Sequence, residues 1–205
     1  RDVERSRGLG DVYKRQPRNS GHGRIGEMVD LRWALTYSNN WISARLMEQL
    51  SPQTLVRNMH NFGITNTLNP VMSICLGSCE VSIREMVGAY TAYANNGMRA
   101  DPLYVTSISD ANGNVISEFS TRHTEVISEA AYAKILSMLL NVVDSGTANR
   151  LRRPPYNLTA EMGGKTGTTN YNSDAWFMAF SPELVNGAWA VSYTHLRAHE
   201  TSLHL

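Results

Sequence analysis

Long apolar runs, cysteine and net charge are all scarce in this 205-residue chain. No apolar stretch reaches the roughly 18 residues that a membrane-spanning helix needs, so we expect no span within it. The formal net charge of +1 argues neither for nor against a charged partner, but no pattern of interleaved aromatic residues accompanies the basic ones near the start. We therefore expect no nucleic acid partner. A hydrophobic content of 42% nevertheless supports a real core.

Two cysteines cannot complete a four-ligand structural zinc site. Cys75 and Cys79 lie in "SICLGSCE", where they either form a disulfide or remain buried thiols, and the residues alone leave both open. The last eleven residues hold three of the six histidines, His195, His199 and His204. The nearby glutamate follows the second of them, so the H-E-x-x-H arrangement is absent. We expect no metal and no cofactor.

Both ends of the chain differ from the middle. "SRGLGDVYKRQ" and "VSYTHLRAHETSLHL" resemble translated sequencing-adapter read-through. We therefore set residues 1–16 and 192–205 aside as non-native or disordered tails. The native part is expected to be a partial domain over residues 17–191.

Periodicity and capping signals divide the middle into helices and strands. Helical spacing predicts helices opening at Asp30, resuming after "SNNW", and restarting at Ser51, Ser82 and Ser128. Ser82 and Glu85 are predicted to form a capping box. Alternation predicts a hairpin over 103–119, with Asn112 and Gly113 in its turn, and strands over 163–169, 174–180 and 187–191. Helices followed by antiparallel strands indicate an α/β (α+β) fold in which an antiparallel sheet is flanked by helices.

The stretch "GGKTGTTN" allows two different kinds of site. A phosphate-binding loop needs a glycine five residues before Gly164, but Thr159 stands there. The alternative is an extended edge strand. In it Lys165 supplies positive charge, Thr166 supplies a hydroxyl for a substrate carboxylate, and Gly167 leaves room for the substrate.

A second motif lies about 125 residues upstream. Ser38 and Asn40 fit an S-x-N pattern at the break between two helices. There Ser38 can relay a proton, and the amide of Asn40 can hold a substrate backbone. The purely structural alternative is that "SNN" only caps the next helix.

Together and in this order, the two motifs resemble the transpeptidase domain of class A (bifunctional) penicillin-binding proteins. The resemblance extends over most of residues 17–191 and includes "LRWALTYSNNWISARLM", "EMVGAYTAYANNG", "DSGTANRL" and "GGKTGTTNYNSDAWFMAFSPELVNGAWAV". It implies a penicillin-binding transpeptidase/β-lactamase-like fold, here incomplete. It also implies peptidoglycan D,D-transpeptidation by serine acyl transfer, with stem peptides and β-lactams as ligands.

The resemblance also assigns roles to single residues. It implies that Ser38 and Asn40 line the cleft and that Ser38 takes part in the proton relay. Lys165 would set the electrostatic potential of the site. Thr166 and Thr168 would bind the substrate carboxylate, with the Thr168 N–H as one oxyanion-hole donor. The substrate-binding set also includes Gly167 and Thr169.

The family's nucleophile motif, S-x-x-K, does not occur in this sequence. The residues three positions before the three lysines (Lys14, Lys134 and Lys165) are Asp11, Ala131 and Met162. We expect the nucleophile upstream of Pro17 in a part not included here, and we expect this fragment to be inactive alone. A glycosyltransferase domain and a membrane anchor are expected in the full-length protein, on the periplasmic face of the membrane. That oxidising setting favours a Cys75–Cys79 disulfide.

Two rivals remain. A class A β-lactamase normally carries Asp where Asn39 stands and an E-x-x-L-N loop between the two motifs, which this sequence lacks. A non-catalytic cell-wall binding or scaffolding protein would keep the cleft without the nucleophile. A covalent β-lactam adduct on the complete protein distinguishes an enzyme from a binding module.

Overall fold

A computed structural model of the chain describes residues 17, 19, 24, 27–169 and 173–191. The tails set aside above and the clustered histidines lie outside these residues. The main sheet has three antiparallel strands, in the order β5 (Gly163–Thr168), β6 (Asp174–Phe180) and β7 (Val185–Val191). All three were predicted. β7 begins two residues earlier than expected because Ser181 N–H closes the turn onto the Leu184 carbonyl at 2.8 Å.

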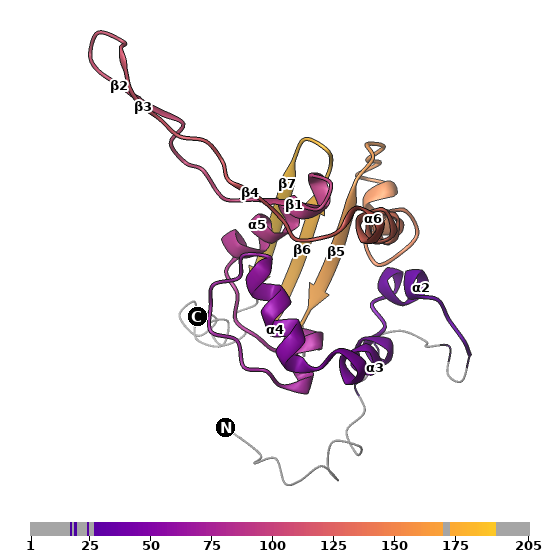
Figure 1. Cartoon of the computed structure of the whole chain (residues 1–205). Coiled ribbons are helices and arrows are strands. Elements are labelled where there is room, and N and C mark those ends of the chain that lie inside the picture. Colours follow the sequence, from indigo (N-terminus) through magenta and orange to yellow (C-terminus); the bar gives the residue numbers. More distant parts are fainter. Residues whose placement is uncertain (1–16, 18, 20–23, 25–26, 170–172, 192–205) are drawn as a thin grey trace, which may run out of the picture.

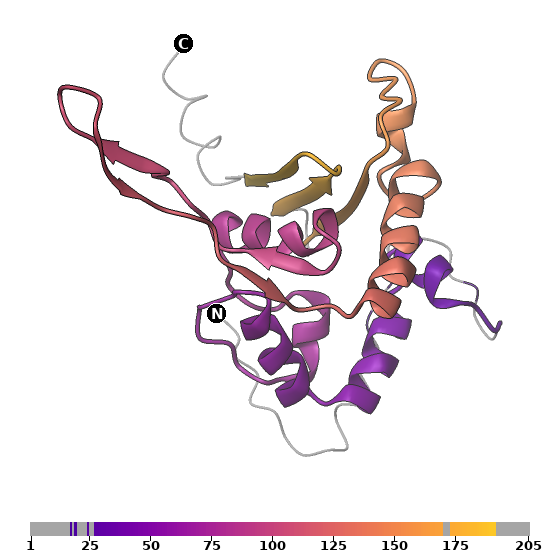
Figure 2. The same ribbon diagram turned by 45° about the horizontal axis from the view of Figure 1, so that its top comes forward.

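Two long helices cover opposite faces of this sheet, α5 (Ile83–Ala94) and α6 (Glu129–Asp144). Phe177 of β6 packs against the buried cluster formed by Val142 and Val143 of α6 with Ala148. Phe180, three residues further on, places its ring 5.8 Å from the ring of Tyr93 of α5. Successive side chains of a strand point to opposite faces, so an odd separation puts the two helices on different sides. The predicted sheet flanked by helices is confirmed (Figures 1 and 2).

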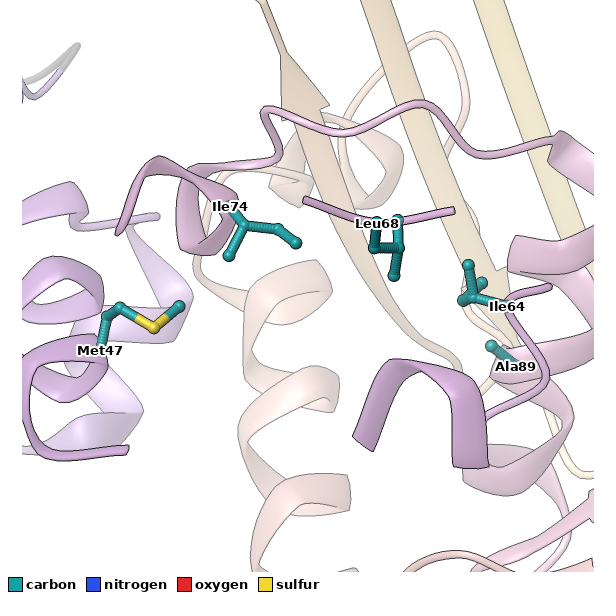
Figure 3. Packing of buried hydrophobic residues seen from close by; sticks show 5 residues of the cluster. All are labelled: Met47, Ile64, Leu68, Ile74 and Ala89. Atoms are coloured by element: carbon teal, nitrogen blue, oxygen red, sulfur yellow. The ribbon is translucent and has the colours of Figure 1, made fainter. Parts of the chain in front are cut away.

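The remaining helical elements are shorter than α5 and α6. They are α2 (Leu31–Thr36), α3 (Asn40–Leu50), α4 (Pro52–Asn61), and the 3₁₀ turns η1 (Met72–Leu76) and η2 (Asn149–Arg152). Asp30 caps α2 by accepting from Trp33 N–H at 2.7 Å, and Ser51 followed by Pro52 begins α4, both as predicted. A buried cluster joins α3, η1 and α5 (Figure 3): Met47, Ile64, Leu68, Ile74 and Ala89.

The predicted capping box at the start of α5 has a wider role than expected. Glu85 accepts from Ser82 N–H at 2.9 Å, and its other oxygen accepts from the backbone N–H groups of Thr65 and Asn66 at 2.7 and 3.1 Å. These donors, the Ser82 N–H foremost, hold the pKa of the buried Glu85 carboxyl at about 2. One carboxylate therefore ties the loop after α4 to the first turn of α5.

The predicted hairpin forms as β2 (Ser107–Ser109) and β3 (Val115–Glu118), and it projects from the body of the molecule in both views (Figures 1 and 2). Its turn has Gly113 at a φ of +86°, in the left-handed region that glycine adopts without strain. The base of the arm is the antiparallel pair of β1 (Met98–Ala100) and β4 (His123–Glu125). That pair was not predicted, because three-residue strands are too short to show alternation.

Candidate active site

Ser38 lies in a tight turn between α2 and α3 with a φ of +51°. A non-glycine residue in the left-handed region costs roughly 1 kcal/mol, so the surrounding bonds must hold it there. Ser38 N–H donates to the Leu35 carbonyl at 3.2 Å, and Asn39 N–H donates to the Ala34 carbonyl at 2.8 Å. The end of α2 therefore fixes the backbone of Ser38 on both sides.

The capping alternative for "SNN" holds for its middle residue. Buried Asn39 caps α3 by accepting from Ile42 N–H at 3.0 Å. Asn40 is the first residue of α3, and its N–H donates to Asn19 Oδ1 at 2.7 Å. Because Asn39 caps the helix, the hydroxyl of Ser38 is not needed for capping and contacts another part of the molecule.

That contact is with Lys165 on β5. The Lys165 ammonium donates to Ser38 Oγ and also to the Thr166 carbonyl, the latter at 2.9 Å. Burial lowers the pKa of Lys165 to about 8, because an ammonium loses hydration there. Lys165 therefore stays largely charged at pH 7 and becomes neutral above about pH 8. The two motifs meet in space although 127 positions separate Ser38 from Lys165.

Thr166 makes a contact that sequence reasoning missed. Its Oγ1 lies 2.7 Å from Oγ1 of Thr147, in the segment that follows α6. We call Ser38, Lys165, Thr166 and Thr147 the junction site. The stretch "DSGTANRL", which contains Thr147, contributes to the family resemblance but predicts no role for this threonine. The sequence signal at this position is a Gly-Thr pair directly after an amphipathic helix. This pair does not predict which residue Thr147 contacts.

The segment around Thr147 is fixed by the same helix end that holds Ser38. Thr147 N–H donates to the Thr36 carbonyl at 3.1 Å, and Asn141 Nδ2 of α6 donates to Thr36 Oγ1 at 2.8 Å. A Cβ on Gly146 would lie 2.7 Å from Thr36 Cγ2 and 2.9 Å from Val142 Cα, and closer still to the Thr36 carbonyl. Only glycine lets the two backbones approach this closely.

The remaining residues of β5 lie along the outer edge of the sheet. Within the described part of the chain, β5 pairs with β6 alone. Thr168 lies two residues after Thr166 and so on the same face, and it is exposed. Gly167 is opposite Trp176, and a Cβ on it would lie 3.3 Å from Trp176 Cβ. Packing is thus a second reason for glycine here.

Thr169 lies beyond the end of β5 and is engaged with the next strand. Asp174 N–H donates to Thr169 Oγ1 at 2.8 Å, and Thr169 N–H donates to the Asp174 carbonyl at 3.1 Å. The Asp174 carboxylate in turn accepts from Trp189 Nε1–H at 3.0 Å. The indole of Trp189 stacks on Trp176 with ring centroids 5.6 Å apart. These contacts brace the β5–β6 connection, and the structure does not bring the Thr169 hydroxyl to Thr166.

Other predicted features lie away from the junction site. Cys75 and Cys79 are unbridged and half-buried on either side of Gly77, packed against the cluster of Figure 3. Burial raises the pKa of both thiols. No group of three or more metal-ligating side chains occurs among the described residues. In the same part of the chain, no helix has the length and apolar character to cross a membrane.

With fold and geometry in place, comparison with known proteins gives the family. The model of the penicillin binding protein transpeptidase domain matches residues 8–204. The chain therefore belongs to the penicillin-binding protein transpeptidase domain family, whose members are acyl-transfer enzymes.

Individual relatives agree. Penicillin-binding protein 1A of Aquifex aeolicus is 34% identical over 84% of this chain and 23% of its own length. The crystal structure of penicillin-binding protein 1A from Haemophilus influenzae matches with a TM-score of 0.73 at 22% identity, over 85% of this chain and 31% of that one. The Mycobacterium tuberculosis PonA1 protein in complex with penicillin V matches with a TM-score of 0.69 at 24% identity, over 82% of this chain and 49% of that one. The chain spans about a quarter of the length of the curated relatives it matches.

Proposed function

We propose that this chain supplies the substrate-binding part of a peptidoglycan D,D-transpeptidase domain. Such a domain cross-links stem peptides through a serine acyl-enzyme and is itself acylated by penicillins. The hydrogen bond between Lys165 and Ser38 carries the proposal. It joins the S-x-N and K-T-G motifs into one site, whereas chance matches to two short motifs would have no reason to meet.

Each residue of the site has a role that its position supports. Ser38, bonded to a lysine whose pKa is about 8, relays a proton during acyl transfer. The positive charge of Lys165 attracts the ligand's carboxylate, and half-buried Thr166 and exposed Thr168 bind it from one face of β5. Asn40 holds the ligand's backbone from the start of α3.

The rest of the substrate-binding set lies along the edge of β5. The ligand adds to this edge as an extended strand, next to Gly167. The N–H of Thr168 serves the oxyanion. Thr169 supports this end of the strand through Asp174.

The nucleophile is not among the residues of this sequence, because no serine lies three positions before a lysine. We expect the 205-residue chain alone to form no covalent β-lactam adduct. The protein read from the native gene through both ends of this frame should carry the S-x-x-K motif, and it should form the adduct. It is also expected to carry a glycosyltransferase domain and a membrane anchor that hold it at the periplasmic face.

The test is labelling with a fluorescent β-lactam, followed by denaturing electrophoresis of both proteins. The extended protein should give a labelled band and the 205-residue chain none. In the extended protein, Lys165→Met should slow acylation by about 100-fold or more. The matched control is Lys134→Met, which removes an exposed lysine of α6 and should label normally. A labelled band from the 205-residue chain would contradict the assignment of the nucleophile.

The absence of S-x-x-K also favours a second candidate, a non-catalytic protein that binds the cell wall. In that case the extended protein would give no labelled band and would still sediment with purified peptidoglycan. Labelling and sedimentation assays on the same preparation separate the two functions.

A further inference from the structure

The hydroxyl of Thr147 lies at the junction site, and none of the roles proposed above uses it. Its Oγ1 is 2.7 Å from Oγ1 of Thr166, within hydrogen-bond distance for two hydroxyls. Thr147 is exposed and Thr166 is half-buried, so the pair lies at the surface of the molecule. Both hydroxyls are therefore close to the edge of β5 where the ligand is proposed to lie.

The backbone of Thr147 is held by hydrogen bonds to residues outside β5. Its N–H donates to the Thr36 carbonyl at 3.1 Å, and Ala148 N–H donates to the Val142 carbonyl at 3.1 Å. Only glycine fits at position 146 in this packing, because a Cβ there would collide with Thr36. The ends of α2 and α6 thus place the Thr147 hydroxyl, and α2 also places Ser38.

The protons of the two hydroxyls can be assigned from their chemistry. Each threonine has one proton to donate, and its oxygen can also accept. A carboxylate only accepts, so Thr166 must donate its proton to a bound carboxylate. The hydrogen bond between the two threonines is then possible only if Thr147 donates and Thr166 Oγ1 accepts.

We propose that Thr147 is a positioning residue for carboxylate recognition. It donates to Thr166 Oγ1, fixes the rotamer of Thr166, and so directs the Thr166 proton toward the terminal carboxylate of the ligand. The inference rests on the proposed role of Thr166 as a carboxylate ligand. It adds the segment after α6 to the S-x-N and K-T-G motifs at the junction site.

The test compares two peptides by NMR titration of the 205-residue chain. One is N-acetyl-L-Lys-D-Ala-D-Ala with a free carboxylate, and the other is its C-terminal amide. Thr147→Val should weaken binding of the acid by about three- to tenfold, the effect of one hydrogen bond, and leave the amide unchanged. Thr147→Ser keeps the donor and should bind the acid within about twofold of the unsubstituted chain. Thr67→Val removes an exposed threonine from the loop after α4 and is the matched control.

The outcomes separate this inference from the proposed function. If the unsubstituted chain does not prefer the acid to the amide, both the inference and the proposed carboxylate site are wrong. If it does prefer the acid and Thr147→Val changes nothing, or weakens both peptides equally, only the inference is wrong.

A double-mutant cycle at Thr147 and Thr166 provides a second test of the same inference. Thr166→Val should remove the preference for the acid, and adding Thr147→Val to it should have no further effect. Independent, additive losses would overturn the inference. If Thr147→Val proves too unstable to titrate, the same cycle is built with Thr147→Ala.

Discussion

The junction site and the β2–β3 arm are organised in opposite ways. At the junction site Lys165 bonds to Ser38, and next to it Asn141 of α6 bonds to Thr36, each across more than a hundred positions of sequence. In the arm the bonds are local. Asp110 accepts from the backbone N–H groups of Asn112 and Asn114 at 2.8 and 2.9 Å.

The two regions therefore differ in how firmly their side chains are held in place. The arm carries exposed apolar side chains and lies away from the body in both views (Figures 1 and 2). The junction site joins two helix ends and one strand, each held by buried neighbours, among them Thr36 and Val142. We expect substitutions at the junction site to change stability or binding, and substitutions in the arm to change little.

The largest expected effect comes from a methyl group at Gly146. Gly146→Ala forces a Cβ against backbone atoms of Thr36 and Val142, which cannot move without shifting α2 or α6. We expect the free energy of unfolding to fall by about 3 kcal/mol, as measured by urea denaturation.

The matched control is the same substitution at the tip of the arm. Gly113→Ala has open space around its Cβ, so only its φ of +86° opposes it, at a cost of about 1 kcal/mol. Equal losses at the two glycines would show that the segment after α6 is not packed against α2.

The second effect is a pH dependence centred on Lys165. Its folded pKa of about 8 lies below the ordinary lysine value of 10.5, so between these two pH values the unfolded chain binds more protons. Stability should therefore rise with pH across this window. Between pH 7 and pH 9.5 the unsubstituted chain should gain about 2 kcal/mol relative to Lys165→Met.

Urea midpoints at several pH values for both chains would measure this difference. Lys134→Met, on the exposed face of α6, should follow the unsubstituted chain at every pH. If the difference in unfolding free energy between the unsubstituted chain and Lys165→Met did not change with pH, the Lys165 ammonium would have to be well hydrated in the folded protein.

The sequence predicted the features that rest on local chemistry. The caps at Asp30 and Ser82, the left-handed glycine of the hairpin turn and the strands of the main sheet all follow from short-range patterns, and the structure confirms them. The pairing of the S-x-N and K-T-G motifs came instead from resemblance to a family. Neither motif alone determines what it faces.

What the sequence did not predict rests on long-range contacts. Thr147 shows no periodic or spacing signal that would link it to Thr166, nineteen positions away. The capping box at Glu85 was expected, but its bonds to Thr65 and Asn66, about twenty positions earlier, were not. Likewise the pKa of Lys165 depends on burial that only the assembled fold creates.

The smallest expected effect is in the arm. Ile116 on β3 is 65% exposed, and threonine keeps the branched Cβ that suits a strand. Ile116→Thr should change the free energy of unfolding by less than about 0.5 kcal/mol and leave peptide binding at the junction site unaltered. The same substitution at Ile74, which is only 4% exposed in the cluster of Figure 3, should cost about 3 kcal/mol because it removes packing and buries a hydroxyl. If Ile116→Thr lost even a third of that amount, the arm would have to pack against the body in solution, and the contrast between the two regions would be smaller than the structure indicates.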